Sequence, residues 1–305
     1  MQSILSKVKL GTQTGGRPPA AVELAPEGVL AAALPAKGQQ PVYAFEPLKP
    51  GALVPGIGEP NVRAAEAVAN AIRSALGQVS PRTRAVTMVL PDTVVRVFVL
   101  DFDSLPGKPA EAFPVLRFRL RKMVPFDVEH AAVSYQVLTE SKSELKVLAA
   151  VIPNAILQEY EAAVRAAGYE PGTVLPSSLA ALAGIDSLEA VLTANLSGLA
   201  LTTSITNGND LLLYRTLDLP EDPGLRLTEV QRGVAVAAAY YEDKLQAPPG
   251  KLFYSGDGSA DGFAQWIDNP DLAVADLAPR PDAGVMTALG ELSIAGVTGA
   301  LAEAG

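Results

Sequence analysis

The sequence predicts an α/β protein built of two lobes. Apolar segments of strand length and amphipathic segments of helix length occur in two successive sets, one in each half of the chain, and such a succession favours two α/β lobes. The 305 residues are 49% hydrophobic and 19% charged, which is typical of a globular protein with an ample core. We therefore expect a folded protein and not a disordered chain.

The first half begins with a hairpin and a helix. Residues 20–34 contain two short apolar strands on either side of the turn Pro26-Glu27-Gly28, and residues 41–48 add a third strand. Residues 61–77 predict an amphipathic helix that ends at Gly77. One face of this helix would carry Val62, Ala65, Val68, Ala69, Ile72 and Leu76.

A more varied stretch follows the first helix. The almost entirely apolar segment 85–91 is typical of a strand in a sheet covered on both faces, and a second strand is expected at 94–102. Residues 111–123 predict a helix that Pro125 stops. Its apolar face would carry Phe113, Leu116, Leu120 and Met123. Strands at 131–138 and 144–152 and a helix at 155–168 complete the first half.

The second half repeats the alternation of strands and helices. Asn207-Gly208, between two apolar strands, is the strongest hairpin turn of the chain. A long helix at 227–245 follows. A strand with a glycine loop at 251–258 and a helix around 263–267 come next.

The composition disfavours several classes of function. The chain has 24 basic and 33 acidic residues and a net charge of −9, so its surface repels phosphate backbones and we expect no nucleic-acid partner. It has no cysteine, which excludes disulfides and cysteine-bound metals. No apolar run predicts a membrane span, and residues 1–11 lack a signal-peptide core. The sequence therefore predicts a cytoplasmic protein.

Two features could hold a metal or act in catalysis, but each has a simpler interpretation. His130 is the only histidine, so a histidine-based site would depend on it, whereas beside Pro125 it could equally be a half-exposed turn residue. Asp101 and Asp103 resemble a metal-binding pair, yet at a strand end they are typical of a turn and cap. We expect no catalytic residue and no metal site.

Two long segments carry a resemblance to a known family. Residues 115–138, "VLRFRLRKMVPFDVEHAAVSYQVL", place a helix before a Pro-Phe turn and a tyrosine-containing strand. Residues 147–184, "VLAAVIPNAILQEYEAAVRAAGYEPGTVLPSSLAALAG", place a strand and a helix before an apolar "SLAAL" helix. In this order and spacing the elements resemble the PilM-type proteins of type IV pilus assembly. The resemblance extends more weakly over nearly the whole chain.

The resemblance implies an actin-like fold of two ribonuclease-H-like lobes. It assigns residues 1–190 to the first lobe, with an extra α/β subdomain inserted at about 86–152, and residues 191–305 to the second. Members of the family carry a helical subdomain in the second lobe, but here only residues 216–226 are available for it. We therefore expect a reduced second lobe that lacks most of this subdomain.

The resemblance also implies a partner and a place in the cell. PilM-type proteins lie on the cytoplasmic side of the inner membrane, and they hold the cytoplasmic tail of the single-span membrane protein PilN. The chain is thus expected to be a peripheral adaptor that contacts other pilus platform or motor components. A cytoplasmic domain of a type II secretion platform protein, which shares the fold, is a further alternative.

The nucleotide motifs of the fold are altered in this chain. Actin-like ATPases hold Mg-ATP between two hairpins that begin Asp-x-Gly, whereas here Glu23 and Asn195 stand at the two carboxylate positions. Pro26 also removes one N–H from the first turn. The glycine loop with Gly256 and Gly258 is the best remaining phosphate loop. Two readings stay open: an adaptor that needs no ATP or other cofactor, or an ATP-binding or ATP-hydrolysing regulator with an altered pocket.

A basic cluster marks the expected partner surface. In the family, a groove between the first lobe and its extra subdomain accepts the tail of the partner, and basic residues there could meet acidic or backbone groups of that tail. The alternative is a solvated helix face. The residues expected to bind the partner are Arg117, Arg119, Arg121, Lys122, Phe126 and Tyr135.

Overall fold

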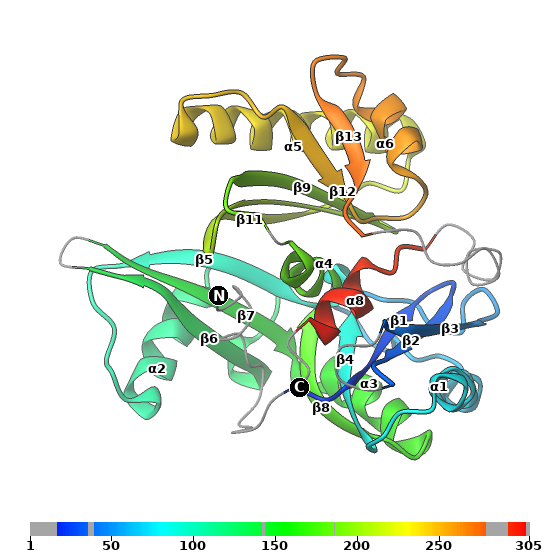
Figure 1. Ribbon diagram of the computed structural model, residues 1–305. Coiled ribbons are helices and arrows are strands. Elements are labelled where there is room, and N and C mark those ends of the chain that lie inside the picture. The colour runs from blue at the N-terminus through cyan, green and yellow to red at the C-terminus, as the bar shows by residue number, and fades with distance from the viewer. Residues whose placement is uncertain (1–16, 36–39, 142–143, 186, 279–291, 303–305) are drawn as a thin grey trace.

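The computed structural model describes residues 17–35, 40–141, 144–185, 187–278 and 292–302. Residues 1–11, which were expected to lack a signal-peptide core, lie outside the described residues. The described chain forms three sheets, and helices cover them (Figure 1). Two of the sheets have five strands each and the third has three.

The first sheet has the strand order β3-β2-β1-β4-β8. Its first three strands pair antiparallel, and β4 and β8 continue it in parallel. The strands are β1 (Ala20–Ala25), β2 (Gly28–Ala33), β3 (Val42–Pro47), β4 (Ala85–Leu90) and β8 (Glu170–Pro176). The helices packed on it are α1 (Ala65–Val79), α3 (Asn154–Ala166), α4 (Ser177–Ala181) and α8 (Ala295–Leu301).

The second sheet repeats the first in both order and strand direction. Its order is β11-β10-β9-β12-β13, again with three antiparallel strands followed by two parallel ones. This repeat is what two lobes of one fold require. The strands are β9 (Ala190–Ser197), β10 (Ala200–Asn207), β11 (Asp210–Asp218), β12 (Lys251–Tyr254) and β13 (Ala273–Asp276). The helices are α5 (Pro223–Leu245) and α6 (Ala260–Ile267).

The third sheet lies between β4 and α3 in the sequence, as an insertion into the first lobe. Its order is β5-β7-β6, all antiparallel. Leu116 and Leu120 of its helix α2 are fully buried. The elements are β5 (Arg96–Phe102), α2 (Pro109–Leu120), β6 (Ala131–Glu140) and β7 (Leu145–Pro153). Short 3₁₀ turns occur at Asp92–Val94, Val128–His130 and Leu182–Gly184.

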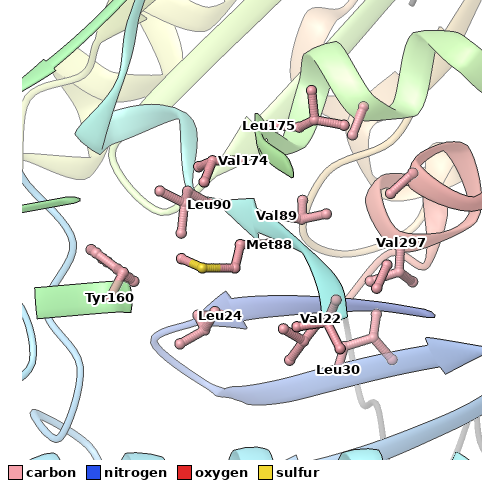
Figure 2. Close-up of a cluster of buried hydrophobic side chains, with 14 of the residues drawn as sticks. Val22, Leu24, Leu30, Met88, Val89, Leu90, Tyr160, Val174, Leu175 and Val297 are labelled. Carbon is pink, nitrogen blue, oxygen red and sulfur yellow. The ribbon is translucent and has the colours of Figure 1, made fainter. Parts of the chain in front are cut away.

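The core of the first lobe joins segments from both ends of the described chain. Leu24, Met88 and Tyr160 are fully buried together (Figure 2). Val297 of α8 lies in the same cluster, so this core includes residues beyond the expected lobe boundary at 190. Burial of these side chains supplies most of the driving force for folding of the lobe.

Several elements differ from the sequence-based expectation. Strands β8 and β13 and helix α8 were not predicted. Helix α1 runs two residues past Gly77 and ends where Ser80 takes a left-handed conformation with φ 48°. Helix α2 ends at Leu120, so Met123 is 40% exposed instead of lying on the buried face. No helix of the described residues is long and apolar enough to cross a membrane.

The second lobe has no room for a helical subdomain at the expected position. Strand β11 ends at Asp218, and α5 begins at Pro223. The side chain of Asp222 caps α5 by accepting a hydrogen bond from the N–H of Leu225 (2.9 Å). The connection is therefore a short capped turn.

Candidate functional site

The residues expected at the nucleotide motifs meet at a small cavity between the lobes. Glu23 comes from β1, Asn195 from β9, and Gly256 from the loop after β12. The cavity has a volume of about 30 Å³. Gly258 is not among the described residues that line it and takes φ 82° further along the loop. The structure thus brings together three of the four candidates.

The carboxyl group of Glu23 is enclosed by elements of both lobes. Its Oε1 accepts a hydrogen bond from Ser177 Oγ (2.5 Å), while its buried Oε2 has no hydrogen-bond partner among the described residues. A Cβ on Gly296 of α8 would lie only 2.5 Å from Oε2, so glycine allows α8 to pack directly over this carboxyl.

Burial raises the pKa of Glu23 to about 7. The hydrogen bond from Ser177 and the backbone N–H of Val297 lower the pKa, and the nearby carboxylates of Asp92 and Asp257 raise it. Because desolvation is the largest of these effects, Glu23 is readily protonated near neutral pH.

Asn195 and the glycine loop close the cavity from the second lobe. Asn195 is 4% exposed, and its Nδ2 donates to the carbonyl oxygen of Ser255 (2.8 Å), which leaves its buried Oδ1 without a partner. A Cβ on Gly256 would lie 2.3 Å from the carbonyl oxygen of Leu196. This glycine therefore serves the close approach of the loop to β9.

The cavity that the described residues enclose is smaller than a typical nucleotide site. Ligand sites for molecules of this size have volumes of about 300–1,000 Å³, whereas about 30 Å³ accommodates little more than a water molecule. No basic side chain of the described residues lines the cavity, and Glu23 and Asp257 are both acidic. The turn between β1 and β2 also lacks the N–H of residue 26, because that residue is proline.

A second buried network next to the cavity was not predicted from the sequence. Asp92, 2% exposed, accepts hydrogen bonds from the N–H of Ser178 (3.1 Å) and from Thr202 Oγ1 (2.8 Å). Burial raises the pKa of Asp92, and these hydrogen bonds oppose the rise. Tyr214 Oη lies 2.5 Å from Ser178 Oγ, and burial raises the pKa of this phenol too. The network joins the first lobe to β10 and β11 of the second.

The only sequence sign of Asp92 is a carboxylate two residues after the end of an almost entirely apolar strand. Ser177 and Tyr214 carry no motif, and Ser178 appears in the sequence only as the first residue of the "SLAAL" segment. They come together only when the lobes are assembled.

The basic residues expected to bind the partner differ in what they contact within the chain. Arg117 donates hydrogen bonds to the carbonyl oxygens of Val128 and Ala131, and thereby fixes the turn after α2. Arg121 pairs with Glu129 at 2.6 Å. Of the four basic residues, Arg119 and Lys122 are exposed and make no hydrogen bond or ion pair with other described residues.

The two expected aromatic residues pack into small cores of the inserted subdomain. Phe126 contacts the cluster around Leu120 and Val128. Tyr135 stands edge-to-face on Phe113, with ring centroids 5.4 Å apart. These rings therefore pack within the inserted subdomain and support its sheet.

The exposed side of α2 carries an apolar residue that the sequence analysis overlooked. Phe118 is 66% exposed and lies beside Arg119. Both line a groove of about 760 Å³ whose far side is formed by Tyr240 and Lys244 of α5. Such exposure of a phenylalanine is a common mark of an interaction surface.

The remaining candidates are turn residues. His130 is exposed, and its Nδ1 lies 2.7 Å from Asp127 Oδ2. The hydrogen bond from the N–H of Glu129 lowers the pKa of Asp127 most, and the contact with His130 lowers it further. Asp101 and Asp103 lie at the end of β5 and in the loop after it. Within the described ranges no group of three or more histidine or acidic residues could hold a metal ion.

Comparisons with known proteins identify the fold. No protein-family model and no curated protein matches the sequence. Among solved structures the chain is similar to a chain of the PilM-PilN type IV pilus biogenesis complex, with 17% identity, a TM-score of 0.71, and coverage of 93% of this chain and 97% of that one. The chain has the fold of a PilM-type protein. The actin-like fold expected from the sequence is thereby confirmed.

A second solved structure is more distantly similar. It is the cytoplasmic domain of EpsL, an inner-membrane component of the type II secretion system of Vibrio cholerae. Identity is 15%, the TM-score is 0.51, and the alignment covers 88% of this chain and 92% of that domain. The PilM-type fold is the better match over a comparable length.

Proposed function

We propose that this chain is a non-enzymatic adaptor of a type IV pilus or a related secretion platform. It binds the cytoplasmic tail of a PilN-like membrane protein and lies at the cytoplasmic side of the inner membrane through its partners. The observation that carries the proposal is a structural similarity that extends over 93% of the chain, to a chain of a PilM-PilN complex. Other platform or motor components are further partners in this proposal.

The geometry between the lobes favours an adaptor over an ATPase. The cavity of about 30 Å³ is lined by acidic and neutral residues, and a triphosphate would need both more space and positive charge. The convergence of Glu23, Asn195 and Gly256 is the one observation that favours the rival function, an ATP-binding regulator.

Calorimetry separates the two functions. The synthetic cytoplasmic tail of the PilN-like protein from the same genome should bind the purified chain, and Mg-ATP up to millimolar concentration should give neither heat nor a rise in melting temperature. Micromolar binding of Mg-ATP with a thermal shift would establish the rival function. Failure of the tail to bind would remove the adaptor function.

The exposed side of α2 is the proposed surface for the tail. The double charge reversal Arg119→Glu and Lys122→Glu should weaken binding of the tail by about tenfold, because these exposed cations are available to a partner. The matched control Arg82→Glu and Lys49→Glu reverses two exposed cations of the first lobe. Equal losses in both double variants would show a non-specific effect of net charge.

A further inference from the structure

A larger groove opens beside the small cavity and belongs to both lobes. Its volume is about 430 Å³. The first lobe contributes the β1–β2 turn, the loop 48–55 and the start of the 3₁₀ turn after β4, while the second contributes the β9–β10 turn, 197–199. Ser197 lines both this groove and the small cavity. Figure 1 shows α2 on the opposite side of the molecule from strands β1, β2 and β3, so this groove is separate from the surface proposed for the tail.

The lining of the groove is apolar and poor in hydrogen-bond donors. Four prolines form much of its wall, and proline has no N–H to offer a phosphate. Leu48, Leu53, Val54 and Leu199 supply aliphatic surface. Backbone hydrogen bonds hold both turns in place. The N–H of Leu48 donates to the carbonyl oxygen of Glu27 (2.9 Å), and the N–H of Leu219 donates to the carbonyl oxygen of Leu199 (2.8 Å). Hydrogen bonds within the chain thus fix both turns that line the groove.

The few polar groups of the groove indicate what it would accept. Glu27, exposed at the rim, is the one charged side chain among the described residues of the lining. Thr93 Oγ1 is buried and has no hydrogen-bond partner among the described residues. Because Thr93 Oγ1 is not exposed to the groove, the charge of an occupant is set by Glu27, which would pair with a positively charged group. A nucleotide or an acidic peptide would instead face a carboxylate with no compensating cation.

We propose that this groove binds an extended apolar peptide segment that carries a basic residue and is supplied by a protein partner. Its aliphatic side chains fill the proline-lined groove, and its basic residue pairs with Glu27 at the rim. A volume of about 430 Å³ lies within the range of about 300–1,000 Å³ typical of ligand sites. Since both lobes line the groove, the bound segment bridges them. This site is additional to the tail surface and does not depend on it.

Selection from a random library of twelve-residue peptides displayed on phage tests the proposal on the whole chain. We expect enriched peptides to combine adjacent aliphatic residues with lysine or arginine. Leu199→Asp should weaken their binding at least about tenfold, because it places a charge in the apolar wall. Glu27→Lys should weaken it by about fivefold, because it reverses the charge at the rim.

The controls separate this groove from the rest of the surface. Leu188→Asp changes a leucine that is 76% exposed and lies outside the groove. The affinity of this variant for the peptides should stay within twofold of that of the unmodified chain. All variants should keep the melting temperature of the unmodified chain within a few degrees. The proposal is overturned if no peptide is enriched, if enriched peptides are acidic, if Leu199→Asp and Glu27→Lys leave binding unchanged, or if millimolar Mg-ATP displaces the peptides.

Discussion

Between pH 5 and pH 8 the free energy of unfolding should fall by about 2.5 kcal/mol on account of Glu23 alone. Burial raises the pKa of this carboxyl from 4.5 to about 7 in the folded protein. Between these two values the folded protein binds more protons than the unfolded chain does, so a rise in pH destabilises the fold. The contribution is favourable below about pH 4.5, decreases up to about pH 7 and levels off above that value.

Urea unfolding of the unmodified chain and of Glu23→Gln, from pH 5 to pH 8, measures this contribution. In the variant, the free energy of unfolding should no longer fall with rising pH by the amount assigned to Glu23. The variant should be the more stable protein at pH 8, because glutamine cannot ionise. Glu66→Gln, at an exposed position of α1, is the matched control and should keep the pH dependence of the unmodified chain. A pH dependence unchanged in Glu23→Gln would mean that water reaches this carboxyl.

Replacing Gly299 by alanine should lower the free energy of unfolding by about 1–3 kcal/mol. The new Cβ would lie 2.0 Å from the carbonyl oxygen of Ala180, which is backbone and cannot move aside without displacing α4. Helix α8 would have to shift away from α4. Val297 and Leu301 would then lose part of their packing in the first core.

The same substitution at Gly77 should have the opposite sign. Gly77 also lies inside a helix, α1, but its added Cβ would meet no atom within 4 Å. Alanine should therefore stabilise the protein by about 0.5–1 kcal/mol through the lower conformational entropy of the unfolded chain. Urea unfolding of the two variants side by side gives both values. If Gly299→Ala is as stable as Gly77→Ala, then α8 does not pack on α4 in solution.

Most strands and helices could be predicted because their apolar residues recur with a clear period. The elements that escaped prediction lack such a period. Strand β8 begins with Glu170-Pro171-Gly172, a sequence typical of a loop, and it forms because β4 offers a parallel partner. Helix α8 is made largely of small residues, and its position depends on close contact with α4 and Glu23.

The site could be predicted only where a motif marked it. Glu23, Asn195 and Gly256 were found through their resemblance to the hairpins and loop of the family, and the structure places all three around one cavity. Asp92 and Tyr214 come from segments more than a hundred residues apart, and no local pattern connects them. The role of Arg117 was also hidden, since a basic cluster does not reveal which of its members already hold backbone carbonyl groups.

The position of α8 also bears on the order in which the chain folds. Tyr43 Oη and Thr298 Oγ1 lie 2.9 Å apart although 255 positions separate them in the sequence. A ribosome therefore releases the whole second lobe before the segment that completes the first one. Until then, the apolar residues of β1 and α4 lack their cover, and the nascent first lobe has to remain soluble without it. The second lobe, whose core needs no later segment among the described residues, can close first.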